Sequence, residues 1–218
     1  MTVLGGDYSH WNLPNFTALV AAGHKFSWLK CSEGTTWIDS RYATHRTNAL
    51  AAGLRVGPYH YFRASLSGVV QAQHFFNTAH NDTLPPAIDV ERINNLGFTQ
   101  ATFRSRLREC LLETERLFGR KPIVYTSKYA WEQLVGLAGW EAEYYLWVAH
   151  YTTAPQPLLP GGWSDWKVWQ YTSVPLDTNR MQSSFWDALN PAPPTDNVTI
   201  TLPREVAEQL HTALHNAT

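Results

Sequence analysis

The segment LPPAIDVER, residues 84–92, brings two acids, Asp89 and Glu91, to the end of an apolar run that is typical of a buried strand. Residues two apart on a strand point to the same face, with Cα atoms about 6.6 Å apart. Two carboxylates so close repel each other, so one stays ionised while the other keeps a proton near neutral pH. Cleavage of a glycosidic bond needs such a pair. A solvated strand end neutralised by Arg92 or Lys30 fits the same spacing.

A β/α alternation around this segment predicts the scaffold that positions the acids. Strands are expected at 3–7, 26–32, 54–62, 85–91 and 121–127, and helices at 40–53, 68–79 and 99–118, with Thr99 as an N-cap. Strand, helix, strand with short links is typical of right-handed βαβ units. After about residue 140, short aromatic strands at 144–151 and 166–173 follow without a long helix. We therefore expect an α/β fold, an irregular TIM-like β/α barrel of parallel strands with few helices in its last third.

The strand ends supply the other candidate site residues. In a parallel barrel, the loops that follow the carboxyl ends of the strands form the active site. The candidates at these ends are, in chain order, Asp7, Lys30, Glu33, His60, Arg63, Asp89, Glu91, Tyr125, Trp147, His150 and Gln170, with Asp177 just beyond the last strand. We expect these side chains to surround one mouth of the barrel.

Composition and charge exclude several partners. The formal net charge is −1 and Lys and Arg are scattered, which argues against a nucleic-acid or anionic lipid surface. No apolar run approaches the length of a membrane span, and the N-terminal residues MTVLGGDYSHW do not look like a secretory signal. The two cysteines, Cys31 and Cys110, match no metal motif, and we expect free thiols, with a single disulfide as the alternative.

The chain divides into three parts. Residues 1–190 are expected to form the catalytic barrel, and the proline-rich segment 191–197 a linker. Residues 198–218 read as a short strand followed by an amphipathic helix. This tail is too short to form its own core, so it is expected to dock on the barrel, to self-associate, or to belong to a larger module.

The quoted strand ends, taken together, resemble glycoside hydrolase family 25, the lysozymes (N-acetylmuramidases). The matching stretches are GGDYSHWN, AAGHKFSWLKCSEGTTWIDSRYATHRTNALAAGLRVGPYHYF, QAQHFF, LPPAIDVE, KPIVYTS, LWVAHYTTAPQP and WKVWQYTS, in the family's order over residues 4 to about 190. The resemblance implies an irregular β/α barrel that needs no cofactor and no metal. It also implies hydrolysis of the β-1,4 bond between N-acetylmuramic acid and N-acetylglucosamine in peptidoglycan.

The resemblance also implies roles for individual residues. Glu91 matches the proton donor, Asp89 the acid that stabilises positive charge or orients the acetamide, and Asp7 a third acid of the pocket floor. Asp177 matches an acid of a Gly-x-Asp-x-Asn element, although Pro175 replaces its glycine. The substrate-binding positions are Lys30, Tyr59, His60, Tyr125, Trp147 and Gln170, of which Lys30 is expected to position an acid and His60 to hydrogen-bond within the pocket wall. Retention, inversion and participation of the substrate's acetamide all remain open.

The leading hypothesis is a phage endolysin that waits in the host cytoplasm until it reaches the cell wall. A non-catalytic wall-binding protein on the same scaffold is one alternative. The other is a metal-dependent polysaccharide deacetylase, for which Asp7, His10 and His60 would be the starting ligands. The scattered histidines show no clustered ligand spacing, which argues against that metal site.

Overall fold

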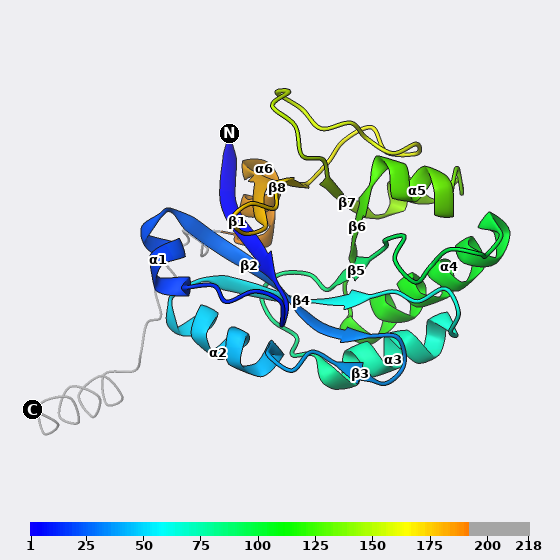
Figure 1. Ribbon diagram of the computed structural model, residues 1–218, viewed down its shortest axis with the longest axis horizontal. Coiled ribbons are helices and arrows are strands. Elements are labelled where there is room, and N and C mark those ends of the chain that lie inside the picture. Colours follow the sequence, from blue (N-terminus) through cyan, green and yellow to red (C-terminus); the bar gives the residue numbers. More distant parts are fainter. Residues whose placement is uncertain (192–218) are drawn as a thin grey trace, which may run out of the picture.

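A computed structural model describes residues 1–191, and eight strands of this part close into a barrel (Figure 1). In order around the barrel they are β1 (Thr2–Tyr8), β2 (His24–Glu33), β4 (Arg55–Tyr61), β5 (Ala87–Asp89), β6 (Ile123–Ser127), β7 (Tyr145–Ala149), β8 (Val168–Thr172) and β9 (Thr178–Gln182). β1 closes the ring because it pairs with β2 on one side and with β9 on the other. The short strand β3 (Trp37–Ile38) forms a hairpin with the end of β2. The predicted α/β barrel is confirmed.

The last strand departs from the predicted parallel arrangement. β1, β2 and β4 to β8 run parallel, whereas β9 pairs antiparallel with both β8 and β1. Since β9 follows β8 after a short link, no crossover helix is available to return the chain, and antiparallel pairing is the geometry that a short link allows. As a result β9 starts, rather than ends, at the mouth of the barrel.

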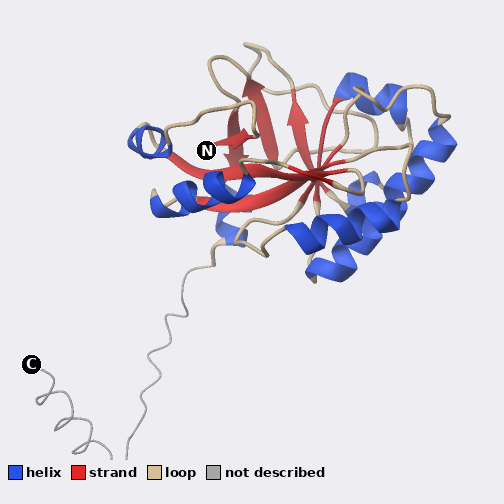
Figure 2. Cartoon of the chain, turned by 60° about the horizontal axis from the view of Figure 1, so that its bottom comes forward, coloured by secondary structure: helices blue, strands red, loops and turns tan. Residues whose placement is uncertain are grey.

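The helices lie outside the strands, and α3 and α4 pack against each other (Figure 2). They are α1 (Phe16–Ala21), α2 (Tyr42–Ala51), α3 (Gly68–Thr78), α4 (Gln100–Phe118), α5 (Lys128–Leu134) and α6 (Ser183–Leu189), with a 3₁₀ turn at Glu141–Glu143. Thr99 caps α4 as predicted, since its side chain accepts a hydrogen bond from the Thr102 N–H. Gly53 follows α2 with φ +89°, the left-handed conformation expected there. Among helices of residues 1–191, none is long and apolar enough to cross a bilayer.

Two apolar layers hold this arrangement together. The outer layer lies between strands and helices and includes Phe62, Phe75 and Phe103. The inner layer fills the barrel with Phe26, Trp28, Ile123, Trp147 and Met181. Because side chains alternate across a strand, strands such as β2, β6 and β7 contribute to both layers. The barrel interior below the mouth is therefore packed, and polar chemistry is confined to the end where the parallel strands finish.

Glycine makes room for the large inner rings. A Cβ on Gly57 of β4 would lie 2.8 Å from Trp28 Nε1 and 2.7 Å from the Leu84 Cβ. The Trp28 indole uses this space to donate a hydrogen bond of 2.9 Å to the Pro85 carbonyl. This contact ties the segment that leads into β5 to the barrel interior. Both cysteines are buried and free, as expected: Cys31 and Cys110 form no disulfide.

Gly57→Ala is expected to destabilise the fold by ~1–3 kcal/mol, because the added methyl overpacks a rigid interior. Thermal unfolding followed by circular dichroism measures this change. Gly161→Ala is the matched control, because its added Cβ meets only the end of the exposed Leu137 side chain, which can rotate away. Equal melting temperatures for Gly57→Ala and the parent protein would contradict the packing described for Trp28.

Candidate active site

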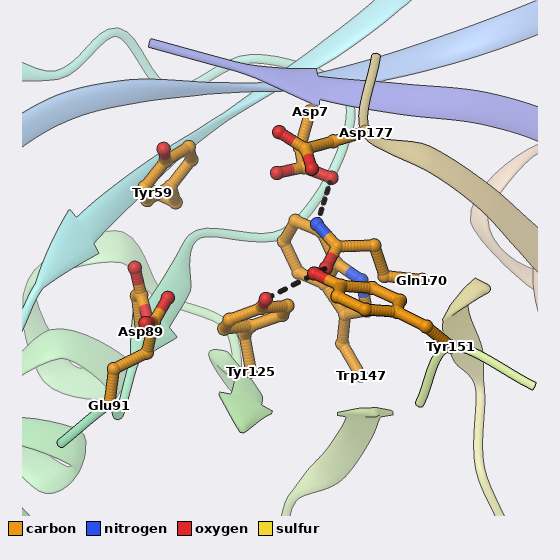
Figure 3. Close-up of a pocket in the computed structure, with 9 residues that line it drawn as sticks. All are labelled: Asp7, Tyr59, Asp89, Glu91, Tyr125, Trp147, Tyr151, Gln170 and Asp177. Atoms are coloured by element: carbon orange, nitrogen blue, oxygen red, sulfur yellow. Dashed lines mark hydrogen bonds between the residues drawn. The ribbon is translucent and has the colours of Figure 1, made fainter. Parts of the chain in front are cut away.

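A cavity of about 170 Å³ opens at the mouth of the barrel (Figure 3). Its lining consists of four acids, three tyrosines, one tryptophan and one glutamine: Asp7, Asp89, Glu91, Asp177, Tyr59, Tyr125, Tyr151, Trp147 and Gln170. Eight of these nine were predicted from the sequence, and Tyr151 was not. The lining residues come from β1, β4, β5, β6, β7 and β8 and from the segments that follow β5 and β7 or precede β9.

Two amides hold Asp7 at the back of this cavity. Its Oδ2 accepts two hydrogen bonds, one of 2.8 Å from Gln170 Nε2 and one of 2.7 Å from Asn179 Nδ2. Asn179 in turn accepts 2.7 Å from the Trp147 indole N–H. Because the carboxylate oxygen, both amides and the ring are buried, the network fixes where Asp7 points.

Two tyrosines extend the network toward the opening. Both hydroxyls donate hydrogen bonds to the same oxygen, Oε1 of Gln170. The bond from Tyr125 is 2.9 Å long and that from Tyr151 is 2.7 Å. Tyr125 lies edge-on to Trp147, with ring centroids 4.8 Å apart. Figure 3 shows these rings as one wall of the cavity, with Asp7 and Asp177 above them and Asp89 and Glu91 beside Tyr125. The site therefore combines flat aromatic walls with carboxyl groups, a combination suited to a sugar ring.

The acids at the back of the cavity bind protons more tightly than free carboxyls. Burial raises the pKa of Asp7 to about 8; the charge of Asp177 adds to the rise, and the bonds from Asn179 and Gln170 reduce it. Burial, followed by the charge of Glu91, raises the pKa of Asp177 to about 6. Burial removes part of the water that would stabilise the charged forms, and the carboxyls repel one another.

Asp89 and Glu91 form a closely coupled pair. Burial, followed by the charge of Glu91, raises the pKa of Asp89 well above its usual value. Burial also raises the pKa of Glu91, but a side-chain hydrogen bond with Asp89 and the charge of Lys30 reduce that rise. The two carboxyls therefore bind protons more tightly than free acids do, and they titrate as a unit. Glu91 is the more exposed of the two.

Lys30 acts on the pair by charge rather than by lining the cavity. Its ammonium pairs with Glu33 at 2.9 Å and lies 4.7 Å from the ring centroid of Tyr61 and 4.9 Å from that of Trp37. Its positive charge lowers the pKa of both Asp89 and Glu91. The placement of Lys30 in the wall fits the expected action on an acid. It does not fit the prediction that Lys30 contacts substrate, because the ammonium pairs with Glu33, lies against the two rings and does not line the cavity.

His60 lies on the other side of its strand. Tyr59 points into the barrel, so its neighbour on β4 points outward. The His60 ring makes hydrogen bonds with Ser32 Oγ at 2.9 Å and Gln71 Oε1 at 3.4 Å, and it packs on Phe75 of α3. Burial lowers its pKa to about 3, so the ring is neutral. The predicted structural hydrogen bonds of His60 are present, but its place among the substrate-binding positions is corrected, because His60 does not line the cavity and instead joins β4 to α3.

The three residues that suggested a metal site do not come together. Asp7 is bound by amides, His10 pairs with Asp39 at 2.8 Å, and His60 faces α3. Within residues 1–191 no other group of three His, Cys, Asp or Glu side chains is arranged to hold a metal ion. The geometry gives the deacetylase alternative no ligand set of the kind it requires.

Two residues of the site were missed by sequence reasoning. Asn179, which holds Asp7, follows Asp177 by two positions, so strand alternation from Asp177 could have found it. Tyr151 lies two residues beyond the end of β7, where the chain has no periodic pattern. The only sequence feature that could have pointed to Tyr151 as a site residue was the group of aromatic residues near it in the sequence.

The site and the fold match known proteins. The sequence matches glycosyl hydrolases family 25 over residues 6–178. It is 31% identical to Lysozyme M1 of Streptomyces globisporus over 184 residues, which are 79% of this chain and 62% of that protein. It is 28% identical to the N,O-diacetylmuramidase of Arthroderma benhamiae, covering 78% of this chain and 76% of that protein.

Solved structures agree with the sequence comparison. The barrel superposes on a family GH25 lysozyme from Aspergillus fumigatus with a TM-score of 0.81 and 27% identity, covering 87% of this chain and 99% of that one. A muramidase from Trichobolus zukalii gives a TM-score of 0.78 with 30% identity, covering 86% and 97%. The chain thus spans a whole GH25 fold but less than two thirds of the length of Lysozyme M1. Because the family match extends over most of the barrel and includes the acid pair, the chain belongs to the glycosyl hydrolases family 25.

Proposed function

We propose that the protein hydrolyses the β-1,4 glycosidic bond between N-acetylmuramic acid and N-acetylglucosamine in peptidoglycan. The observation that carries the proposal is the neighbouring acids Asp89 and Glu91, with raised pKa values, in a cavity walled by aromatic rings. One proton shared by two carboxyls supplies both the acid and the negative charge that the reaction needs. Family membership and the names of the relatives support the same reaction.

Glu91 is proposed as the proton donor because it is the member of the pair nearer the opening, where a leaving oxygen would lie. Burial raises the pKa of both carboxyls, so one proton can pass between them and reside on Glu91 when the bond breaks. Transfer leaves Asp89 ionised beside the sugar, where its charge stabilises the developing oxocarbenium ion or orients the acetamide. The two roles are thus linked by one proton.

Asp7 and Asp177 are proposed as acids of the pocket floor. The proton that Asp7 keeps near neutral pH makes it a hydrogen-bond donor rather than a second full charge. A neutral donor there can bind a sugar hydroxyl or acetamide oxygen without adding to the repulsion on Asp89. Tyr59, Tyr125, Trp147 and Gln170 are proposed to line the saccharide subsite, together with Tyr151.

A wall-binding protein without turnover is the second candidate function. It would share the fold and the aromatic walls but would have no use for a shared proton. Release of reducing sugar from purified walls separates the two candidates, since a binding protein would sediment with walls and release none. Muramic acid at the new reducing ends would further distinguish the proposed activity from a glucosaminidase or an amidase.

The biological setting stays a prediction from the sequence. Peptidoglycan is the proposed partner, and action at the cell wall follows from it. A phage origin and a wait in the host cytoplasm are part of the same hypothesis, which purification of the protein from infected cells before and after lysis would test. The predicted linker beyond residue 191 and the proposed self-association through 198–218 lie outside the described residues.

Glu91→Gln is expected to reduce the rate of wall hydrolysis by roughly 10²–10⁴-fold, because an amide cannot donate the proton that a placed acid supplies. Reducing-end release from purified walls measures the rate. The fold should survive, since Gln has nearly the shape of Glu and carries no charge to desolvate, and thermal unfolding checks this.

Glu109→Gln is the control for charge loss alone, because Glu109 is an exposed residue of α4. It should hydrolyse walls at the parental rate. If Glu91→Gln cleared walls as fast as Glu109→Gln, the proposed role of the pair would be wrong.

Asp7→Asn is expected to reduce the change in the free energy of unfolding between pH 5 and pH 8. The pKa of Asp7 is raised from 3.8 to about 8 in the folded protein, so between these values the folded state holds a proton that the unfolded state has lost. The stability of the parent therefore falls as the pH rises through this window. Asn accepts the same two amide hydrogen bonds and has no proton to lose. Urea unfolding at pH 5 and pH 8 should show a smaller difference for Asp7→Asn than for the parent; an equal difference would mean that Asp7 is ionised in the fold.

A further inference from the structure

A second cavity, of about 480 Å³, adjoins the first. The two share Glu91, Tyr125 and Tyr151 as a common wall. The rest of its lining comes from the segments that follow β5, β6 and β7: Arg92, Ile93, Ser127, Tyr129, Ala130, Ala149 and His150. We call it the side groove. A group attached to a sugar in the first cavity would enter it directly, because Glu91 borders both.

Among residues 1–191, Arg92 is the one Lys or Arg side chain that lines the side groove. Its guanidinium lies 4.8 Å from the ring centroid of Tyr129. Within residues 1–191 it forms no ion pair, and its buried Nε has no hydrogen-bond partner. It is also not among the charges that shift the pKa of Asp89 or Glu91. The sequence left open that Arg92 neutralises the acid pair, but the structure assigns that charge to Lys30.

The other polar groups of the side groove include further donors. His150 Nδ1 accepts 3.0 Å from the Leu158 N–H, so the ring proton is on Nε2 and that atom is a donor. Ser127 Oγ accepts from the Ala130 N–H and keeps its own hydrogen. Ile93, Ala130 and Ala149 add apolar surface between these groups. A cation, neutral donors and small apolar side chains together suit a short peptide arm that carries a carboxylate.

We propose that the side groove binds the carboxylate-bearing arm of the substrate and that Arg92 recognises its carboxylate. This rests on the proposed function, because in peptidoglycan that arm is the peptide amide-linked to the lactyl group of muramic acid, and the carboxylate is the peptide's own. Arg92 can offer two parallel N–H donors to one carboxylate while its face stays on Tyr129. The side groove thereby favours N-acetylmuramic acid, the sugar that carries the arm, in the position beside Glu91. Polymers of N-acetylglucosamine have no such arm and no carboxylate for Arg92 to bind.

The experiment compares two probes by isothermal titration calorimetry. One is N-acetylmuramyl-L-alanyl-D-isoglutamine, which has a free carboxylate, and the other is the same molecule with that carboxylate converted to an amide. The parent protein is expected to bind the acid at least about tenfold more tightly than the amide, the size of effect that a charge-assisted hydrogen bond produces. In Arg92→Gln this ratio should fall to about one, and in Arg92→Lys it should be intermediate, because Lys keeps the charge but not the planar fork.

Arg116→Gln is the matched control, since Arg116 is an exposed arginine of α4 paired with Glu113. It should keep the parental ratio. Affinity for the amide probe reports whether Arg92→Gln still forms the rest of the groove. If Arg92→Gln preferred the acid as strongly as the parent does, or if the parent bound both probes equally or neither, the proposal would be overturned. Wall hydrolysis by the parent is measured separately, so an inactive parent would count against the proposed function and not against the groove.

Discussion

The exclusion of water from carboxyl groups that share one barrel mouth is the constraint on which the site depends. An isolated carboxylate placed there would lose its hydration, and its neighbours would repel it. The chain meets this cost in two ways. Asp7 is bound by the amides of Gln170 and Asn179, and the pKa values of Asp89 and Glu91 are raised, which favours one proton held between them. The raised pKa values are therefore a consequence of where the barrel ends, and they are also what makes proton donation near neutral pH available.

The antiparallel strand β9, the irregular part of the barrel, helps to bring polar residues to the cavity. A parallel last strand would deliver its C-terminal residue to the mouth, whereas the antiparallel β9 delivers its first residues. Asp177 and Asn179 reach the cavity in this way, beside Gln170 of β8. Below them, Trp28 and Trp147 pack at 4.9 Å between ring centroids and close the interior. Packing of the two tryptophans thus closes the bottom of the cavity. The antiparallel direction of β9 brings the acid Asp177 to the cavity wall.

Much of this could be predicted because the signals were local. The α4 cap at Thr99, the left-handed Gly53 and the spacing of Asp89 and Glu91 each depend on a few neighbouring residues. What was missed depends on contacts between distant parts of the chain. β9, α5 and α6 are five to seven residues long, too short for a clear period. The face on which His60 lies depends on how β4 packs against β2 and α3, which no short segment reports.

The central claim is that Asp89 and Glu91 keep one proton between them near neutral pH. Carboxyl ¹³C chemical shifts of Asp and Glu, followed from pH 3 to pH 9 in the parent and in Asp89→Asn, test it most directly. The account predicts that one carboxyl of the pair titrates well above the usual range of a free acid, and that replacing Asp89 changes the titration of Glu91. Two carboxyls that both ionise independently near pH 4 would contradict it.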